Sequence, residues 1–120
     1  MNSRIMYVRD NNWNPIGCIV IKVDRNHRRA QYNLAVLNPK DNIKFDRHES
    51  QRRAMTRLIE EPLTVVIPKD ATQHDISLAV MSDIADSNAP ARAIKFAKAW
   101  VASTVKWYTI DFPPRVKYQS

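Results

Sequence analysis

The hydrophobic pattern of this chain changes its period near residue 38, and that change is the strongest constraint on its fold. Before it, residues 3–9, 17–24 and 29–37 alternate in polarity or run continuously in β-branched residues. After it, apolar residues recur at helical spacing. A period of two is typical of strands, and a period near 3.6 is typical of helices. The chain is therefore predicted to form strands first and helices afterwards.

The three strand-like segments are joined by short connections rich in turn-forming residues, which favours an antiparallel meander. In the first segment, Ile5 and Tyr7 would lie on one face, with Met6 and Val8 on the other. The residues predicted to face inward from the other two segments are Ile19, Ile21 and Val23, and Ala30, Tyr32, Leu34 and Val36. Polar residues alternate with the last set, so we expect one face of the sheet to be covered and the other to be solvated.

A helix and a fourth strand are predicted to follow the meander. Asp46 fits the N-cap of the helix, with Glu49 reaching back to the cap, and the helix would run to about Glu60. Pro62 would end it. Residues 63–67 (LTVVI) are short, β-branched and bounded by prolines, which is typical of a strand.

Two more helices are predicted, over residues 75–85 and about 89–107. The second would begin at residues 88–90 (Asn-Ala-Pro), a cap followed by proline in the first turn. The final residues, DFPPRVKYQS, would be extended at their paired prolines and could add an edge strand. We therefore expect a single α+β domain over residues 1–120, with an antiparallel sheet of three to five strands packed against two or three helices.

The last predicted helix carries two apolar stripes. One consists of Ile94, Ala97, Val101 and Val105, and the other of Ala93, Phe96, Trp100 and Trp107. A helix that is apolar on two sides is either central in its fold or committed to a partner subunit. Because large aromatic side chains are costly to expose, we expect a homo-oligomer formed through Phe96, Trp100 and Trp107.

Positive charge is concentrated in one part of the chain. There are 19 Lys and Arg residues against 12 Asp and Glu, a formal net charge of +7. Residues 25–57 hold nine of the basic residues and three of the acids. Arginine is suited to bidentate phosphate contacts, although a solvated helix face with i,i+4 salt pairs is the alternative interpretation. The candidate phosphate-binding residues are Arg28, Arg29, Lys40, Arg47, Arg53 and Arg57.

Trp13 stands in a polar turn that no amphipathic pattern explains. An exposed tryptophan beside arginines is suited to stacking on a nucleic-acid base or on adenine. The alternative is that it caps the end of the sheet. We include Trp13 among the candidate ligand-binding residues.

Several functional classes are disfavoured by what the chain contains. Cys18 is the single cysteine and lies in an apolar run, which indicates an inert buried thiol and a reducing compartment. The three histidines show no metal-ligand spacing, and the single glycine, Gly17, excludes glycine-rich phosphate loops. We therefore expect no enzyme, no catalytic residue, no metal and no cofactor. The N-terminus lacks a secretory signal and no run is long enough to span a membrane, so we expect a cytoplasmic protein that does not enter membranes.

Residues 32–58, YNLAVLNPKDNIKFDRHESQRRAMTRL, resemble a pattern found in small phage-encoded proteins. In that pattern a strand leads into N-P-x-D, then F-[DN]-[RK], then a helix bearing R-x-x-x-R-L. With its size, its strand-first order and its basic charge, the chain is similar to the anti-Thoeris sponge family. The resemblance implies a multimeric, non-enzymatic protein of the host cell cytoplasm that sequesters cyclic ADP-ribose-type or cyclic oligonucleotide immune signals at subunit contacts.

Three hypotheses about function follow. The first is capture of a small phosphate-bearing ligand, most specifically a cyclic nucleotide-type immune signal, as phage counter-defence. The second is binding of nucleic acid without sequence readout. The third is a phage-type inhibitor that acts by protein–protein interaction, with its positive charge steering the encounter.

Overall fold

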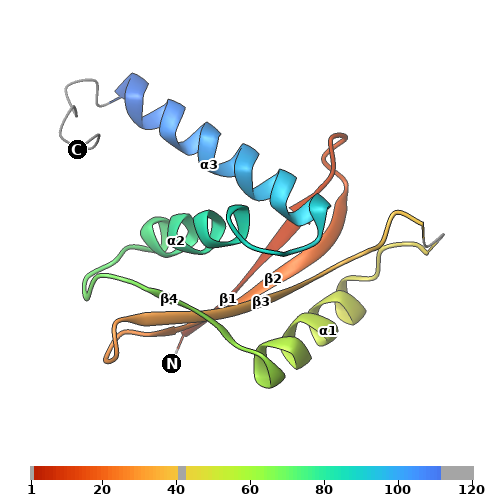
Figure 1. Cartoon of the computed structure of the whole chain (residues 1–120), viewed down its shortest axis with the longest axis horizontal. Helices are drawn as coiled ribbons and strands as arrows, with labels where there is room; N and C mark the ends of the chain where they lie inside the picture. Colours follow the sequence, from red (N-terminus) through yellow and green to blue (C-terminus); the bar gives the residue numbers. More distant parts are fainter. Residues whose placement is uncertain (1, 41–42, 112–120) are drawn as a thin grey trace.

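The computed structural model describes residues 2–40 and 43–111, and within them the chain forms one four-stranded antiparallel sheet (Figure 1). The strands are β1 (Asn2–Arg9), β2 (Pro15–Asp24), β3 (Arg29–Val36) and β4 (Leu63–Val66). They lie side by side in the order β1-β2-β3-β4, so each strand pairs with its neighbour in sequence. The predicted meander and the predicted fourth strand are confirmed.

Three helices complete the fold. They are α1 (Arg47–Glu60), α2 (Gln73–Ala85) and α3 (Ala91–Asp111). Figure 1 shows α1 on one face of the sheet, and α2 and α3 on the other. The α+β class is confirmed, but the expectation of a solvated face is wrong, because α1 covers the part of that face formed by β2 and β3.

Two cores lie on opposite faces of the sheet, as the alternation of β2 requires. Ile19, Ile21 and Val23 face α2 and α3 in the larger core. Cys18 and Val20 face α1 in a smaller core. The residues that join the larger core from the other elements include Val8, Tyr32, Leu34, Val80, Ile84, Ala93 and Ala97. The predicted inward faces of β2 and β3 are confirmed.

The helix starts follow from their caps, with small corrections to the predicted boundaries. Asp46 caps α1 by accepting the N–H of Glu49 at 3.2 Å, as predicted, but the Glu49 side chain turns to the arginines of its own helix instead of reaching back. Thr72 and Asp75 form a capping box, so α2 begins at Gln73, earlier than expected. Helix α3 begins just after Pro90, whose carbonyl accepts the N–H groups of Ala93 and Ile94. Residues 112–120, where an extended tail was predicted, lie outside the described residues.

Gly17 allows β2 and β3 to approach closely at the end of the sheet where β2 begins. A Cβ atom at this position would lie 2.3 Å from the carbonyl oxygen of Ala35 and 2.8 Å from the Cα of Val36. Any larger residue would force the two strands apart. Beside it, the N–H of Leu37 donates to the carbonyl of Ile16 at 2.8 Å, and so draws the end of β3 against the start of β2.

Candidate anion-binding cleft

The turn between β1 and β2 presents an exposed tryptophan on a fixed backbone. The Asp10 carboxylate accepts the N–H groups of Asn12 and Asn14, each at 2.9 Å. The N–H of Trp13 donates to the carbonyl of Asp10, also at 2.9 Å. These bonds hold Trp13 at φ 67, a left-handed conformation that is uncommon for a bulky residue. Its side chain remains 68% exposed.

Arg9 places a positive charge beside this indole. Its Nη1 donates to the carbonyl of Trp13 at 3.0 Å, and its guanidinium carbon lies 5.5 Å from the centre of the Trp13 ring. This is the geometry of a cation–π contact. The tryptophan and the arginine therefore form one unit, held by both a hydrogen bond and a ring contact.

The N-terminal part of α3 supplies the opposite wall. Arg92, Lys95, Phe96 and Ala99 recur at intervals of three and four and share one helix face. Together with the β1–β2 turn they enclose a cleft of about 400 Å³. Its remaining lining residues are Arg9, Asp10, Asn11, Trp13 and Ile16. The volume is in the range of clefts that hold small ligands, roughly 300–1,000 Å³.

A second hollow of about 540 Å³ adjoins this cleft and shares Ile16 and Arg92 with it. Arg92 reaches across the boundary, where its Nη1 donates to the carbonyl of Leu37 at 3.0 Å. The far wall of the second hollow comes from the segment between β3 and α1. The residues that line this hollow but not the Trp13 cleft are Asn14, Pro15, Leu37, Asn38, Pro39, Ile43, Lys44 and Phe45.

The residues that the sequence indicated as ligand-binding lie in different parts of the structure. Trp13 lines the cleft, and Lys40 is exposed in the segment after β3, outside the lining. Arg47 is exposed in the first turn of α1. Arg53 lines a small hollow of about 60 Å³ beside Lys44.

Three arginines of α1, Arg52, Arg53 and Arg57, form hydrogen bonds within the protein. Glu49 accepts hydrogen bonds from Arg52 and from Arg53, the latter at 3.1 Å. These bonds, more than the charges alone, lower the pKa of Glu49 to about 2. Arg57 donates to the carbonyl of Leu34 at 3.3 Å. For Arg52 and Arg53 the structure shows the salt-paired helix face that was the alternative to an anion site.

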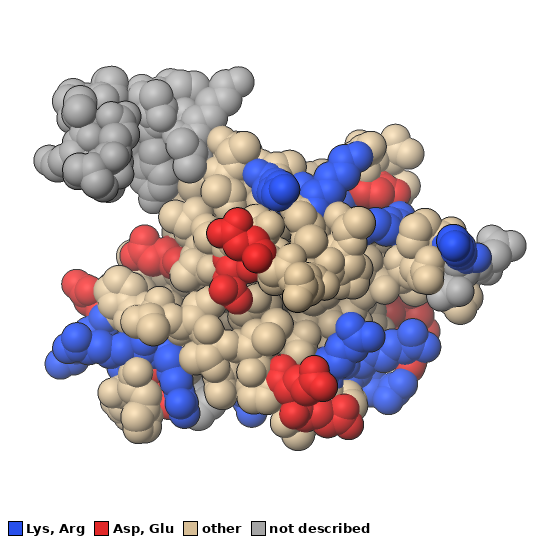
Figure 2. Space-filling model, viewed as in Figure 1, with Lys and Arg blue, Asp and Glu red and all other residues tan. Residues whose placement is uncertain are grey.

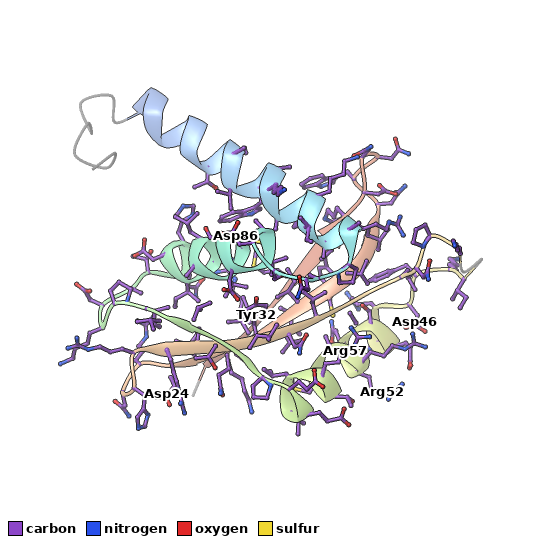
Figure 3. All side chains as sticks on the ribbon, viewed as in Figure 1. Asp24, Tyr32, Asp46, Arg52, Arg57 and Asp86 are labelled. Carbon is purple, nitrogen blue, oxygen red and sulfur yellow. The ribbon has the colours of Figure 1, made fainter. Side chains whose placement is uncertain are left out.

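Arg28 and Arg29 lie at the other end of the sheet from Trp13. They belong to the β2–β3 turn, and successive turns of a meander lie at opposite ends. Asp24 bonds with His27 at 2.8 Å and pairs with Arg29 at 3.7 Å. Figure 3 shows Asp24 and Asp46 at opposite ends of the molecule, and Figure 2 shows Lys and Arg side chains toward both ends. Arg28 and Arg29 therefore lie apart from Trp13, the candidate residue that lines the cleft.

The sequence did not indicate Arg9, Arg92 or Lys95 as ligand-binding residues. Phe96 was noted, but as part of a subunit interface. Phe96 and Trp100 are partly buried against the larger core, and the Trp100 ring lies 5.7 Å from that of His74. The side chain of Trp107 lies outside the described residues. The homo-oligomer therefore stays a prediction.

Other chemistry has little support within the described part of the chain. Cys18 is buried, and burial raises the pKa of its thiol. Residues 2–40 and 43–111 contain no group of three or more His, Cys, Asp and Glu side chains placed to hold a metal. Among these residues no helix is both long enough and apolar enough to cross a membrane.

Comparison of the chain with protein-family models, with curated proteins and with solved structures finds no match. The geometry and chemistry of the cleft are therefore the basis for its proposed function.

Proposed function

We propose that this protein binds a phosphate-bearing ligand that carries an aromatic ring, of the nucleotide class, in the cleft between the β1–β2 turn and α3. One observation carries the proposal: the exposed ring of Trp13, on a turn whose backbone is held by hydrogen bonds, lines a cleft whose opposite wall holds Arg92 and Lys95. A ring and two cations on opposite walls suit a ligand that has a base at one end and a phosphate at the other.

The energies of these contacts support a small ligand of this kind. Stacking of a base on an aromatic side chain contributes about 1–3 kcal/mol. A hydrogen bond from a charged donor contributes about 1.5–3 kcal/mol, and less in an open cleft where water screens the charge. One stacked base and two phosphate contacts together contribute roughly 4–9 kcal/mol before the cost of association.

Capture without chemical conversion is the proposed activity. Among the described residues that line the cleft, Asp10 is the one carboxylate, and it already accepts two backbone N–H groups. A carboxylate held in this way supports the turn and is poorly placed to act as a general base. The resemblance of residues 32–58 favours a cyclic nucleotide-type immune signal as the captured ligand.

The test is to purify the protein from cells, denature it, and search for a released nucleotide by mass spectrometry. Calorimetry with AMP as the probe then measures the cleft directly. We expect Trp13→Ala to weaken AMP binding about tenfold, because the stacked ring is lost. Trp13→Phe, which keeps an aromatic face, should retain most of the affinity. Equal AMP affinity in the wild type and in Trp13→Ala would contradict the proposed site.

Binding of nucleic acid is the second candidate function, and the basic residues at the far end of the sheet favour it. Lys22, Arg25, Arg28, Arg29 and Lys69 lie at or near the β2–β3 turn and the segment after β4. A polyanion could contact both ends of the molecule, whose longest dimension is 47 Å. Such binding would weaken steeply with salt, because each neutralised phosphate releases counterions.

A further inference from the structure

We propose that the ligand has two rings joined through phosphate, as in a dinucleotide, and that it occupies both the Trp13 cleft and the adjoining hollow. This inference rests on the proposed function and specifies the class of ligand. Its basis is the junction of the two hollows, which share Ile16 and Arg92 and contain separate aromatic side chains.

The two hollows hold different aromatic side chains: Trp13 and Phe96 line the first and Phe45 lines the second, but Phe96 packs against the larger core and leaves Trp13 as the ring for stacking. Trp13 lines the first and is largely exposed. Phe45 lines the second and is partly buried. Its ring meets that of Tyr7 edge to face, with the centroids 6.3 Å apart and the planes at 85°. Contact with Tyr7 fixes the orientation of Phe45, so a second base would meet a ring already in position.

Arg92 lies where the linking phosphate would be. Its Nη1 is bound to the carbonyl of Leu37, and this bond fixes the guanidinium at the boundary of the two hollows. A guanidinium has five N–H donors in a planar fork, so donors remain for phosphate oxygens. An arginine held by one bond and open at its other donors is suited to a phosphodiester or a pyrophosphate.

The charges on either side of Arg92 fit the same ligand. Lys95 lies on the Trp13 side and Lys44 on the Phe45 side. With Arg9 and Arg92 they make four cations, against the single carboxylate of Asp10 among the described lining residues. The hollows, of about 400 and 540 Å³, are each in the range that holds a small ligand. A mononucleotide would leave one of them, with its ring and its lysine, unused.

The experiment is calorimetry with three defined probes: AMP, the dinucleotide pApA and a ten-residue oligo(dA). We expect pApA to bind at least about tenfold more tightly than AMP, because a second ring and a second cation are engaged. The affinity per site should not rise further with oligo(dA). Lys44→Ala should bring pApA to within about threefold of AMP and leave AMP itself unchanged.

Matched variants separate this inference from the proposed function. Lys69→Ala removes another exposed lysine, at the far end of the sheet, and should leave both affinities unchanged. Phe45→Leu keeps apolar packing against Tyr7 but removes the aromatic face, so it should weaken pApA selectively. Unfolding curves of each variant exclude loss of the fold as the cause.

The results have distinct meanings. Equal affinity for AMP and pApA, both lost in Trp13→Ala, would overturn the two-ring ligand and leave the proposed function intact. No binding of either probe, with no nucleotide released from the purified protein, would overturn both. Affinity that keeps rising from pApA to the oligonucleotide would also overturn the inference, in favour of the nucleic-acid alternative.

Discussion

The two ends of the sheet are both basic, but they are built differently. At the β2–β3 end, the Asp24 carboxylate takes up Arg29 and His27, and Arg25 donates to the carbonyl of Ala71 at 2.8 Å. At the β1–β2 end, the Asp10 carboxylate is used by backbone N–H groups, and the nearby cations of Arg92 and Lys95 line hollows. The same residue types therefore give a salt-paired surface at one end and an open cationic cleft at the other.

Charge density in the sequence is therefore a poor guide to an anion site. The densest basic stretch forms α1 and the β2–β3 turn, where Glu49 and Asp24 hold several of its arginines. The cleft gathers fewer cations, but it adds an exposed ring and a concave shape. Binding energy depends on the donors left available around a hollow, because paired charges on a flat surface contribute little.

The largest expected effect on AMP binding comes from removing two positive charges at the cleft, with the removal of two charges at the far end of the sheet as the comparison. Arg92→Ala with Lys95→Ala should weaken AMP binding about thirtyfold, since each partly screened phosphate contact is worth about 1 kcal/mol. Arg28→Ala with Arg29→Ala makes the same change in net charge at the far end. Calorimetry should show less than about a twofold change for that pair.

The charge-matched pair also tests the nucleic-acid alternative. A long polyanion that contacts both ends would lose affinity in both double variants, with a reduced salt slope in each. Comparable losses of AMP binding in the two double variants would remove the distinction between the ends and contradict the assignment of the cleft.

A smaller effect is expected from the two turn aspartates, which have parallel roles at opposite ends. Asp10→Ala removes the acceptor of two backbone N–H groups and frees the turn that presents Trp13. We expect AMP affinity to fall roughly fivefold and stability to fall by about 1 kcal/mol. Asp24→Ala, which also removes a turn acceptor, should lower stability by a similar amount and leave AMP affinity unchanged. Denaturant unfolding and calorimetry on the same samples separate the two effects.

Much of the fold could be predicted because it depends on local periodicity. The alternation in β2 and β3 places Ile19, Ile21 and Tyr32 in the larger core, as expected. The position of α1 could not be predicted, because both faces of β2 are apolar and the sequence does not say which helix covers which face. The incorrect expectation of a solvated face came from the polar residues that alternate with the inward-facing residues of β3.

The candidate site was only partly predictable. The polar turn left two interpretations of Trp13, an exposed stacking residue or a cap on the end of the sheet, and the structure shows its side chain exposed. Its partners Arg92 and Lys95 are some eighty residues away in sequence, and only the packing of α3 beside the β1–β2 turn brings them near. The one available signal was the spacing of residues 92, 95, 96 and 99 on a single helix face. The opposite placement of Arg28 could have been deduced from the meander, whose alternate turns lie at opposite ends.

The smallest expected effect concerns Glu49 and asks whether the arginines of α1 are truly engaged. Its hydrogen bonds to Arg52 and Arg53 lower its pKa from 4.5 to about 2. Because folding lowers the pKa of this carboxyl, its ionised form stabilises the protein at pH values above 4.5, its ordinary pKa. This stabilisation is lost as the pH falls from 4.5 toward 2. Glu49→Gln should therefore make stability less dependent on pH within that window.

The direct measurement is an NMR titration of the Glu49 carboxyl carbon, with a midpoint expected near 2. Because the side chain is 41% exposed, the midpoint should move upward at about 1 M salt, where the screening length falls to about 3 Å. Glu60→Gln is the control, because it makes the same chemical change later on α1, at an exposed carboxylate with no ion pair in the described part of the chain. It should leave the pH dependence of stability as in the wild type.

If Arg53 belonged to the ligand site, its release in Glu49→Gln would tighten AMP binding at neutral pH. We expect no change, because the Trp13 cleft draws its cations from β1 and α3 and not from α1.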